Sequence, residues 1–249
     1  MHFFDIMCRS KSRIVLALDL TGPSLLDRAL RILDETYEYL AAVKVNRHLS
    51  IPLSLEDLNK LTSAIHDRGL PAIMDCKVND IGSTNRVMAE LFFNAGFDAL
   101  TVSPLTGWEE GLEPVYEVAR SFNRGILELV YMSHPGASRY YEALILNRST
   151  LTLKALYEVL LEEAIGRGAD GLIVAATRPS IVSRVKRAAQ GRSHVYSPGV
   201  GYQGGSASEA VKAGADFLIV GRSIVLSSNP KEEALKLYRL VSTSLARGL

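Results

Sequence analysis

The stretch Ile73-Met74-Asp75-Cys76-Lys77-Val78-Asn79-Asp80-Ile81 is where this chain is predicted to place its chemistry. It begins as an apolar strand and then places Asp75, Lys77 and Asp80 just before a helical pattern that starts near Ser83. Side chains two apart on a strand point to the same side, so Asp75 and Lys77 are predicted to share a face. Charges at the end of an apolar strand are costly to desolvate unless they are paired or used. The stretch alone is therefore typical of either a structural Asp–Lys pair or a functional site.

Short apolar runs alternate with amphipathic segments on both sides of this stretch. The predicted strands are Ile14–Asp19, Ala42–Asn46, Ala72–Lys77, Ala99–Ser103, Ile126–Tyr131, Gly171–Ala175, His194–Ser197 and Phe217–Val220. The predicted helices are Ser24–Leu40, Ser54–Asp67, Thr84–Asn94, Glu109–Ser121, Leu151–Arg167, Pro179–Ala189, Ser206–Ala213 and Pro230–Leu245. Apolar strands that alternate with helices indicate a parallel sheet covered by helices.

Helix-end signals repeat along the chain and support this count. Three segments place Gly where a helix should stop and Asp before a strand: Gly96-Phe97-Asp98, Gly168-Ala169-Asp170 and Gly214-Ala215-Asp216. Eight such units fit one α/β domain over residues 1–249, a (β/α)₈ TIM barrel. An open doubly wound sheet is the alternative, but the Gly-rich fingerprint of that fold is absent after Asp19.

Two parts of the chain stand outside the eight units. Residues 1–12 are expected to form an N-terminal extension. Residues 133–150 form an extended loop after the fifth strand, with room for a short extra helix over Ser138–Leu146. Connections of this length are often functional.

The composition narrows the classes of protein. The 249 residues are 47% hydrophobic and 22% charged, with a net charge of +1, which gives no electrostatic case for a nucleic acid or an anionic membrane as partner. The two cysteines, Cys8 and Cys76, imply no disulfide framework and suit a reducing compartment. No apolar run approaches the roughly 18 residues that span a bilayer, and Met1–Arg13 lacks the apolar region of a signal peptide. The sequence therefore predicts a cytoplasmic protein.

Charged residues lie at the ends of three consecutive predicted strands. Asp19 ends the first, Lys44 lies near the end of the second, Asp75 and Lys77 end the third, and Asp80 lies just beyond. In a (β/α)₈ barrel the active site is built at these C-terminal ends. Two carboxylates brought close raise each other's pKa, while interposed ammonium groups keep both ionised. The pattern favours an alternating charged array over a set of unrelated structural charges.

A glycine-rich segment follows the seventh predicted strand. It reads Ser197-Pro198-Gly199-Val200-Gly201-Tyr202-Gln203-Gly204-Gly205 and leads into a helix, while Gly221-Arg222-Ser223 follows the eighth strand. Gly-rich turns expose backbone N–H groups and helix N-termini favour anions, so both suit a phosphate, which barrels often hold after strands seven and eight. Arg222 would add a bidentate contact. Tight turns without a ligand are the alternative, and the nearby Arg222 weakens it.

The fifth strand ends in Met132-Ser133-His134-Pro135-Gly136. Ser133 is placed to hydrogen-bond a substrate ring. A histidine beside proline in a loop is more often structural, so Ser133 is favoured over His134. The other histidines show no ligand spacing and no Cys/His cluster exists, so no metal site is predicted.

Taken together, these motifs resemble the orotidine 5′-phosphate decarboxylase family, most closely its archaeal branch. The resemblance rests on Leu18-Asp19, Val43-Lys44-Val45, Asp75-x-Lys77-x-x-Asp80-Ile81, Met132-Ser133-His134-Pro135-Gly136, Ser197-Pro198-Gly199-Val200-Gly201-x-Gln203-Gly204-Gly205 and Gly221-Arg222-Ser223-Ile224. The matches run in order over nearly the whole chain. The resemblance implies cofactor-free decarboxylation of orotidine 5′-phosphate to UMP and carbon dioxide, the last step of de novo pyrimidine nucleotide synthesis.

The resemblance also implies a role for each matched residue. Lys77 would protonate the carbanion left at C6 of the pyrimidine, Asp75 would lie beside the departing carboxylate, and Lys44 and Asp80 would complete the array. The substrate would be bound by Asp19 and Lys44 at the ribose, by Ser133 at the pyrimidine edge, and by Pro198, Gly199, Val200, Gly201, Gln203, Gly221 and Arg222 at the 5′-phosphate. Ile81 is counted with these binding residues. In this family the equivalents of Asp80 and Thr84 reach the partner subunit's site, which implies an obligate homodimer.

Two other functions stay open at this point. A sister decarboxylase or aldolase acting on a sugar phosphate, such as 3-keto-gulonate 6-phosphate decarboxylase or hexulose-phosphate synthase, shares the Asp-x-Lys-x-x-Asp pattern but binds Mg²⁺ with an added acidic residue; Ser133 and Gln203 favour the pyrimidine nucleotide instead. A non-catalytic nucleotide-binding barrel is disfavoured by the intact Lys77. Departures from the family pattern at Asn46, Cys76, Asn79 and Tyr202 leave the local loop shape open.

Overall fold

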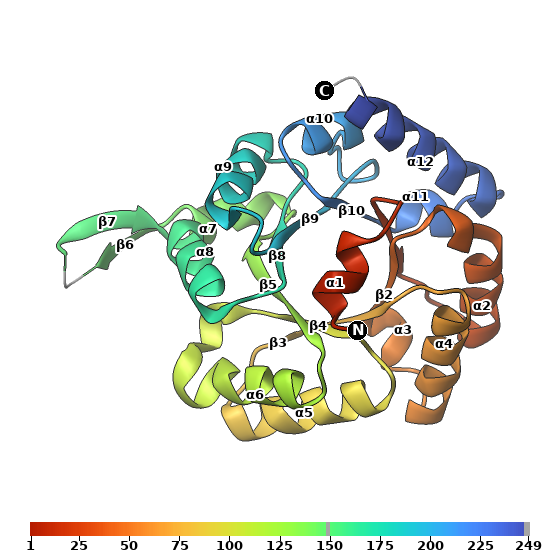
Figure 1. Cartoon of the computed structure of the whole chain (residues 1–249), viewed down its shortest axis with the longest axis horizontal. Helices are drawn as coiled ribbons and strands as arrows, with labels where there is room; N and C mark the ends of the chain where they lie inside the picture. Colours follow the sequence, from red (N-terminus) through yellow and green to blue (C-terminus); the bar gives the residue numbers. More distant parts are fainter. Residues whose placement is uncertain (148–149, 247–249) are drawn as a thin grey trace.

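A closed barrel of parallel strands forms the centre of the molecule in the computed structural model, which describes residues 1–147 and 150–246 (Figure 1). Its strands are β1 (Ile14–Leu18), β2 (Ala42–Asn46), β3 (Ala72–Val78), β4 (Ala99–Val102), β5 (Gly125–Tyr131), β8 (Gly171–Val174), β9 (His194–Pro198) and β10 (Phe217–Val220). Around the barrel they follow the order β1-β10-β9-β8-β5-β4-β3-β2. The predicted (β/α)₈ barrel is confirmed; of the ranges predicted for the domain and its long loop, residues 148–149 and 247–249 lie outside the described residues.

Helices surround the barrel (Figure 1). They are α2 (Leu25–Thr36), α4 (Leu55–Asp67), α5 (Gly82–Asn94), α6 (Glu113–Ser121), α8 (Leu156–Arg167), α9 (Pro179–Ala189), α10 (Ala207–Lys212) and α12 (Pro230–Ala246), with the shorter α3 (Arg47–Ser50), α7 (Ser138–Tyr141) and α11 (Arg222–Val225) at strand ends and in the loop after β5. Strand residues alternate between the barrel interior and the layer under the helices, and both sides are apolar. This two-sided burial explains why the strands read as continuous apolar runs.

The first helix, α1 (Phe3–Cys8), closes one end of the barrel and lies at the centre of the ring in Figure 1. Phe3 and Met7 are each 1% exposed and pack with the interior residues of the strands. A Cβ added at Gly125, the first residue of β5, would lie 2.6 Å from the Phe3 ring, so only glycine admits this ring. The expected N-terminal extension is therefore part of the barrel core.

The repeated Gly/Asp signals have one structural explanation. The three glycines that end helices all have positive φ, between 78° and 105°. Each following aspartate then accepts a hydrogen bond from the first residues of a neighbouring strand, at 2.8–2.9 Å. The pairs are Ala72 N to Asp98, Ile126 N to Asp170 and Val195 N to Asp216. The motif thus joins adjacent strands at the end of the barrel that α1 closes.

The loop after β5 differs from the prediction. The expected helix over Ser138–Leu146 is limited to α7, and the helix expected from Leu151 begins at Leu156. Between them lie β6 (Leu144–Asn147) and β7 (Thr152–Ala155), which pair as an antiparallel hairpin that projects from the barrel (Figure 1). Leucine and isoleucine are compatible with either helix or strand, so the local pattern did not separate the two.

Candidate active site

A cavity of about 320 Å³ opens at the C-terminal ends of the barrel strands. The predicted site residues that line it are Asp19, Lys44, Asp75, Lys77, Ser133, Pro198, Gly199, Val200, Gln203, Gly221 and Arg222. Its size is in the range of small-molecule sites. The structure thus brings together most of the residues that sequence reasoning selected, from β1, β2, β3 and the loops after β5, β9 and β10.

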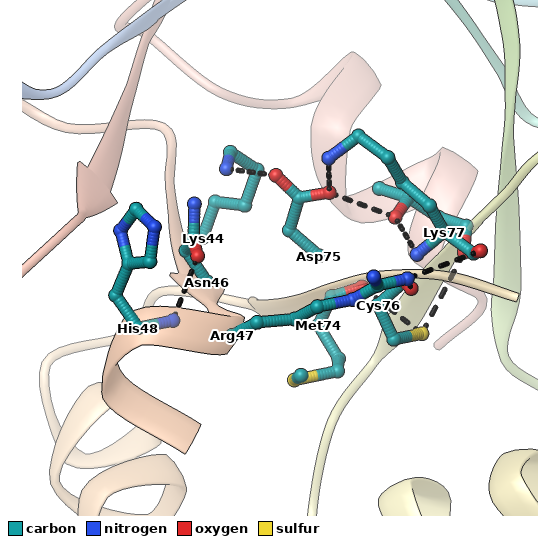
Figure 2. Close-up of polar contacts among 9 residues, drawn as sticks. Lys44, Asn46, Arg47, His48, Met74, Asp75, Cys76 and Lys77 are labelled. Carbon is teal, nitrogen blue, oxygen red and sulfur yellow. Dashed lines mark hydrogen bonds and ion pairs between the residues drawn. The ribbon is translucent and has the colours of Figure 1, made fainter. Parts of the chain in front are cut away.

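A carboxylate between two ammonium groups forms the floor of this cavity (Figure 2). Lys44 Nζ donates to Asp75 Oδ2, and Lys77 Nζ donates to Asp75 Oδ1 at 2.6 Å. The Thr101 hydroxyl, from β4, donates to the same Oδ1 at 3.0 Å. Lys44 and Asp75 are only 4% and 7% exposed. Lys44 and Asp75 are therefore held with little water, whereas the Lys77 side chain is 33% exposed toward the cavity.

The charge state of Asp75 follows from these contacts. Burial by itself would raise the pKa of the Asp75 carboxyl, but the ammonium groups of Lys44 and Lys77 outweigh burial and hold this pKa below its usual range. Asp75 is therefore an anion at neutral pH. A negative charge fixed at the floor of a cavity repels any second anion brought against it.

Lys77 does not continue a regular strand. Its φ is 45°, in the left-handed region, and the pairing of β3 with β4 shifts register between Met74 and Val78. Non-glycine residues rarely adopt this conformation, and it persists only where surrounding contacts hold it. Here the Lys77 backbone N–H donates to Thr101 Oγ1 at 2.9 Å, and Arg47 Nη2 donates to the carbonyl oxygens of Cys76 and Lys77 (Figure 2). Neighbouring elements thus hold Lys77 beside Asp75.

Cys76 is directed away from the cavity. Its side chain is 1% exposed and packs in the apolar layer beneath the helices, while Asp75 and Lys77 face the cavity. Burial and the nearby Asp75 charge raise the pKa of the Cys76 thiol to about 12. A protonated, enclosed thiol has no nucleophilic role here.

Asp19 lies beside the loop that follows β10. A Cβ added at Gly221 would lie 3.0 Å from Asp19 Oδ2, so the carboxylate is close to the Gly221 backbone. The Oδ1 atom of Asp19 is buried and has no hydrogen-bond partner among the described residues. A buried acceptor without a partner is costly unless a ligand supplies the donor.

The glycine-rich loop forms the opposite wall. A Cβ added at Gly199 would lie 2.8 Å from Gln203 Oε1 and 3.2 Å from the Ser133 Cβ, so these three residues are in close contact. Gly199 has a φ of 93°. Gly201 was predicted to contact the phosphate, but it does not line the cavity. Its N–H donates to the Gly205 carbonyl at 2.9 Å. Its hydrogen bond shapes the loop and is not directed toward the cavity.

Three predicted residues lie outside the cavity of their own chain. Asp80, Ile81 and Thr84 are exposed at the start of α5, where the chain has turned outward beyond β3. Asp80 Oδ1 accepts a hydrogen bond from the Ile81 N–H at 2.7 Å. Within a single chain, Asp80 is therefore not part of the group formed by Lys44, Asp75 and Lys77, and its place in a partner subunit's site stays a prediction.

Sequence reasoning missed part of the site. Thr101 is fully buried and joins Asp75 to Lys77, and its polar side chain within an apolar strand was an available signal. Asn46, His134 and Tyr202 also line the cavity, together with the apolar residues Ala17, Leu129, Met132, Ile173 and Ile219. These apolar positions are indistinguishable from other strand residues by pattern alone.

Neither a metal-binding cluster nor a membrane-spanning helix is present among this chain's described residues. Within residues 1–147 and 150–246, no group of three His, Cys, Asp or Glu side chains is placed to hold a metal ion. Over the same residues, no helix combines the length and the apolar character needed to cross a membrane.

Comparison with known proteins gives one consistent result. Residues 12–237 match the family model described as "Orotidine 5'-phosphate decarboxylase / HUMPS family". The orotidine 5′-phosphate decarboxylases of Methanosarcina mazei and Thermococcus kodakarensis are 35% and 38% identical, over 93% and 92% of this chain and 96% of each relative. The crystal structure of orotidine 5′-monophosphate decarboxylase from Methanocaldococcus jannaschii, complexed with inhibitor BMP, has a TM-score of 0.78 and 29% identity, covering 92% of this chain and 98% of that chain.

Proposed function

Because the chain belongs to the orotidine 5′-phosphate decarboxylase / HUMPS family, we propose that it decarboxylates orotidine 5′-phosphate to UMP and carbon dioxide, the last step of de novo pyrimidine nucleotide synthesis. The observation that carries the proposal is the Lys44–Asp75–Lys77 group at the floor of the cavity, in which the Asp75 carboxylate is buried between two ammonium groups. It is the arrangement that a carbanion-forming reaction needs when charge is stabilised by fixed protein groups.

In the proposed mechanism, Asp75 and Lys77 act in sequence on the pyrimidine. The Asp75 anion lies beside the substrate carboxylate and disfavours that charge before carbon dioxide leaves. As the C6–carboxylate bond breaks, its electron pair stays on C6, where the Lys77 ammonium stabilises it. Lys77 then delivers its proton to C6, and Lys44 keeps Asp75 ionised throughout. In this sequence of steps, the Lys44–Asp75–Lys77 group alone stabilises the carbanion, and no electron-sink cofactor is needed.

The proposed binding roles follow the cavity walls. Asp19 and Lys44 bind the ribose hydroxyls, and the unpartnered Asp19 Oδ1 is available to accept one of them. Ser133 binds the pyrimidine edge. The 5′-phosphate lies between Gln203, Arg222 and the backbone at Pro198, Gly199, Val200 and Gly221. Binding energy from this remote phosphate can be used to close the loop after β9 over the reacting ring.

We further propose a homodimer in which Asp80, Ile81 and Thr84 complete the partner's site. Their exposure outside their own cavity supports this arrangement. Ile81, Val87 and Leu91 are 66%, 54% and 46% exposed along α5, which is a large apolar surface for one helix. A two-fold dimer would bury that apolar surface. It would also place Asp80, Ile81 and Thr84 of each subunit at the site of the other.

The proposed compartment is the cytoplasm. Both cysteines are free thiols, and Cys8 is exposed, which suits a reducing environment.

The direct test is a spectrophotometric assay of orotidine 5′-phosphate turnover, without added metal and again after treatment with EDTA. We expect turnover to UMP in both cases. Loss of activity on chelation, or turnover of a 3-keto sugar phosphate in place of the nucleotide, would contradict the assignment. Replacement of the exposed Lys60 by alanine serves as the control for removal of a lysine outside the cavity.

A further inference from the structure

The Arg222 guanidinium lies over the Tyr202 ring at the cavity wall. The Arg222 guanidinium carbon lies 3.8 Å from the centroid of the Tyr202 ring. The other arginine–aromatic pairs within the described residues are more distant, at 5.5–6.0 Å. Tyr202 comes from the loop after β9 and Arg222 from the start of α11, and both line the cavity. The contact therefore joins the two loops on either side of the phosphate position.

Within residues 1–147 and 150–246, the Arg222 side chain makes no other polar contact. Among the described residues, no carboxylate lies within 4.0 Å of its guanidinium and no hydrogen bond is made by it. Arg47 is a useful contrast because its guanidinium is already bonded to the carbonyl oxygens of Cys76 and Lys77. The Arg222 N–H groups are thus free for a ligand, while its planar face is covered by the ring.

We propose that Tyr202 is a positioning residue that orients Arg222 for the phosphate group of the nucleotide. Stacking uses only the face of the guanidinium and leaves the in-plane N–H donors directed at a phosphate, which arginine binds with two parallel hydrogen bonds. An arginine without this support would lose more rotamer freedom on binding. The ring acts through Arg222, and its phenolic hydroxyl has no part in the effect.

The proposal rests on the phosphate site of the proposed function, and it makes a distinct prediction. Tyr202 is 68% exposed, so the effect is that of a largely solvated cation–aromatic contact. We expect Tyr202→Ala to weaken binding of phosphate-bearing ligands about three- to tenfold. Binding and turnover of a nucleoside that lacks the phosphate should be unchanged, because Arg222 has no ligand in that complex.

The test uses the full-length protein and five variants: Tyr202→Ala, Tyr202→Leu, Tyr202→Phe, Arg222→Ala and the double variant that combines Tyr202→Ala with Arg222→Ala. UMP affinity is measured by calorimetry, and kcat and KM are measured for orotidine 5′-phosphate and for orotidine. Tyr140→Ala is the matched control, since Tyr140 is 65% exposed and is paired with Arg139 at 5.8 Å outside the cavity. Circular dichroism and thermal unfolding verify that each variant folds.

The expected result for Tyr202→Ala and Tyr202→Leu is a raised Kd for UMP and a lowered kcat/KM for orotidine 5′-phosphate. Tyr202→Phe should restore wild-type binding because it keeps the ring. In the Arg222→Ala background, Tyr202→Ala should have no further effect. Additive losses, a loss in Tyr202→Phe, or an equal loss with orotidine would overturn the positioning role. If the wild type itself fails to turn over orotidine 5′-phosphate, the proposed function fails, and UMP binding still decides whether Tyr202 acts through Arg222.

Discussion

The Lys77 ammonium donates to Asp75 Oδ1 at 2.6 Å from a residue whose backbone is left-handed, with a φ of 45°. The pair is therefore not the product of simple strand alternation. The register shift between Met74 and Val78 places Lys77, and contacts from Thr101 and Arg47 maintain it. The proposed proton donor thus depends on two neighbouring elements, β4 and α3, as well as on its own strand.

Replacing Lys77 by alanine should abolish the proposed proton delivery. We expect kcat for orotidine 5′-phosphate to fall by at least about 10²–10⁴-fold, the usual contribution of a positioned acid. UMP affinity should change little, because Lys77 is not at the phosphate position. Steady-state kinetics and calorimetry measure the two effects, with Lys60→Ala as control. Near-normal turnover in Lys77→Ala would exclude its role as the donor.

Asp75→Asn should lower stability as well as activity. The variant leaves the Lys44 ammonium buried without an anion, which typically costs about 3–5 kcal/mol. The folded-state pKa of Asp75 lies below its unfolded value, so its stabilising contribution is present above about pH 4 and is lost as pH falls. Urea unfolding of both proteins should therefore differ most at neutral pH. A difference that stays constant down to pH 3 would contradict this account.

Arg47→Ala should change catalysis without changing binding. Its guanidinium holds the carbonyl groups of the two peptides that flank Lys77, so its loss frees the left-handed backbone. We expect kcat to fall about tenfold or more, because small displacements of a catalytic group are costly, while UMP affinity stays within about twofold. Arg47→Lys should restore part of the rate. Arg31→Ala, at an exposed arginine, is the control. A parallel loss of UMP affinity in Arg47→Ala would indicate a general structural defect instead.

Glu128 should give stability a measurable pH dependence. It is fully buried on β5 between the Tyr116 hydroxyl at 2.5 Å and Arg167 at 3.3 Å. Burial raises its pKa despite both contacts, so the folded protein binds this proton more tightly than the unfolded chain. Its contribution is complete below about pH 4.5 and is lost as pH rises through the folded-state value. Glu128→Gln should make the unfolding free energy fall less steeply as the pH rises above about 4.5; an unchanged slope would refute the assignment.

Mixed dimers would test whether Asp80 acts in the partner's site. Lys77→Ala and Asp80→Ala should each be nearly inactive alone. After the two are unfolded together and refolded, random pairing places one intact site in half of the dimers, so activity should return to about a quarter of wild type. If Asp80 served its own chain, mixing would restore nothing. Size-exclusion chromatography with light scattering verifies that the mixed protein is dimeric.

Much of the fold could be predicted because apolar strands, glycine stops and aspartates recur in each unit. The strands Ala42–Asn46 and Phe217–Val220 agree with the prediction to the residue. The prediction was wrong where local signals are weaker. Thr152–Ala155 pairs with Leu144–Asn147 as a hairpin instead of forming a helix. Phe3–Cys8 forms a helix that is too short for its periodic pattern to predict it. Short segments adopt the structure that their neighbours stabilise.

The sequence by itself determined which side chains reach the open end of the barrel. The C-terminal ends of parallel barrel strands all lie at the same rim, so a charged residue at a strand end is placed there. That placed Asp19, Lys44 and Asp75 around one cavity. Only the tertiary structure decided that Thr101 joins Asp75 to Lys77 and that Asp80 turns outward. These outcomes depend on backbone dihedral angles and on contacts between strands far apart in the chain. Local pattern specifies the burial of a residue, whereas packing specifies its partners.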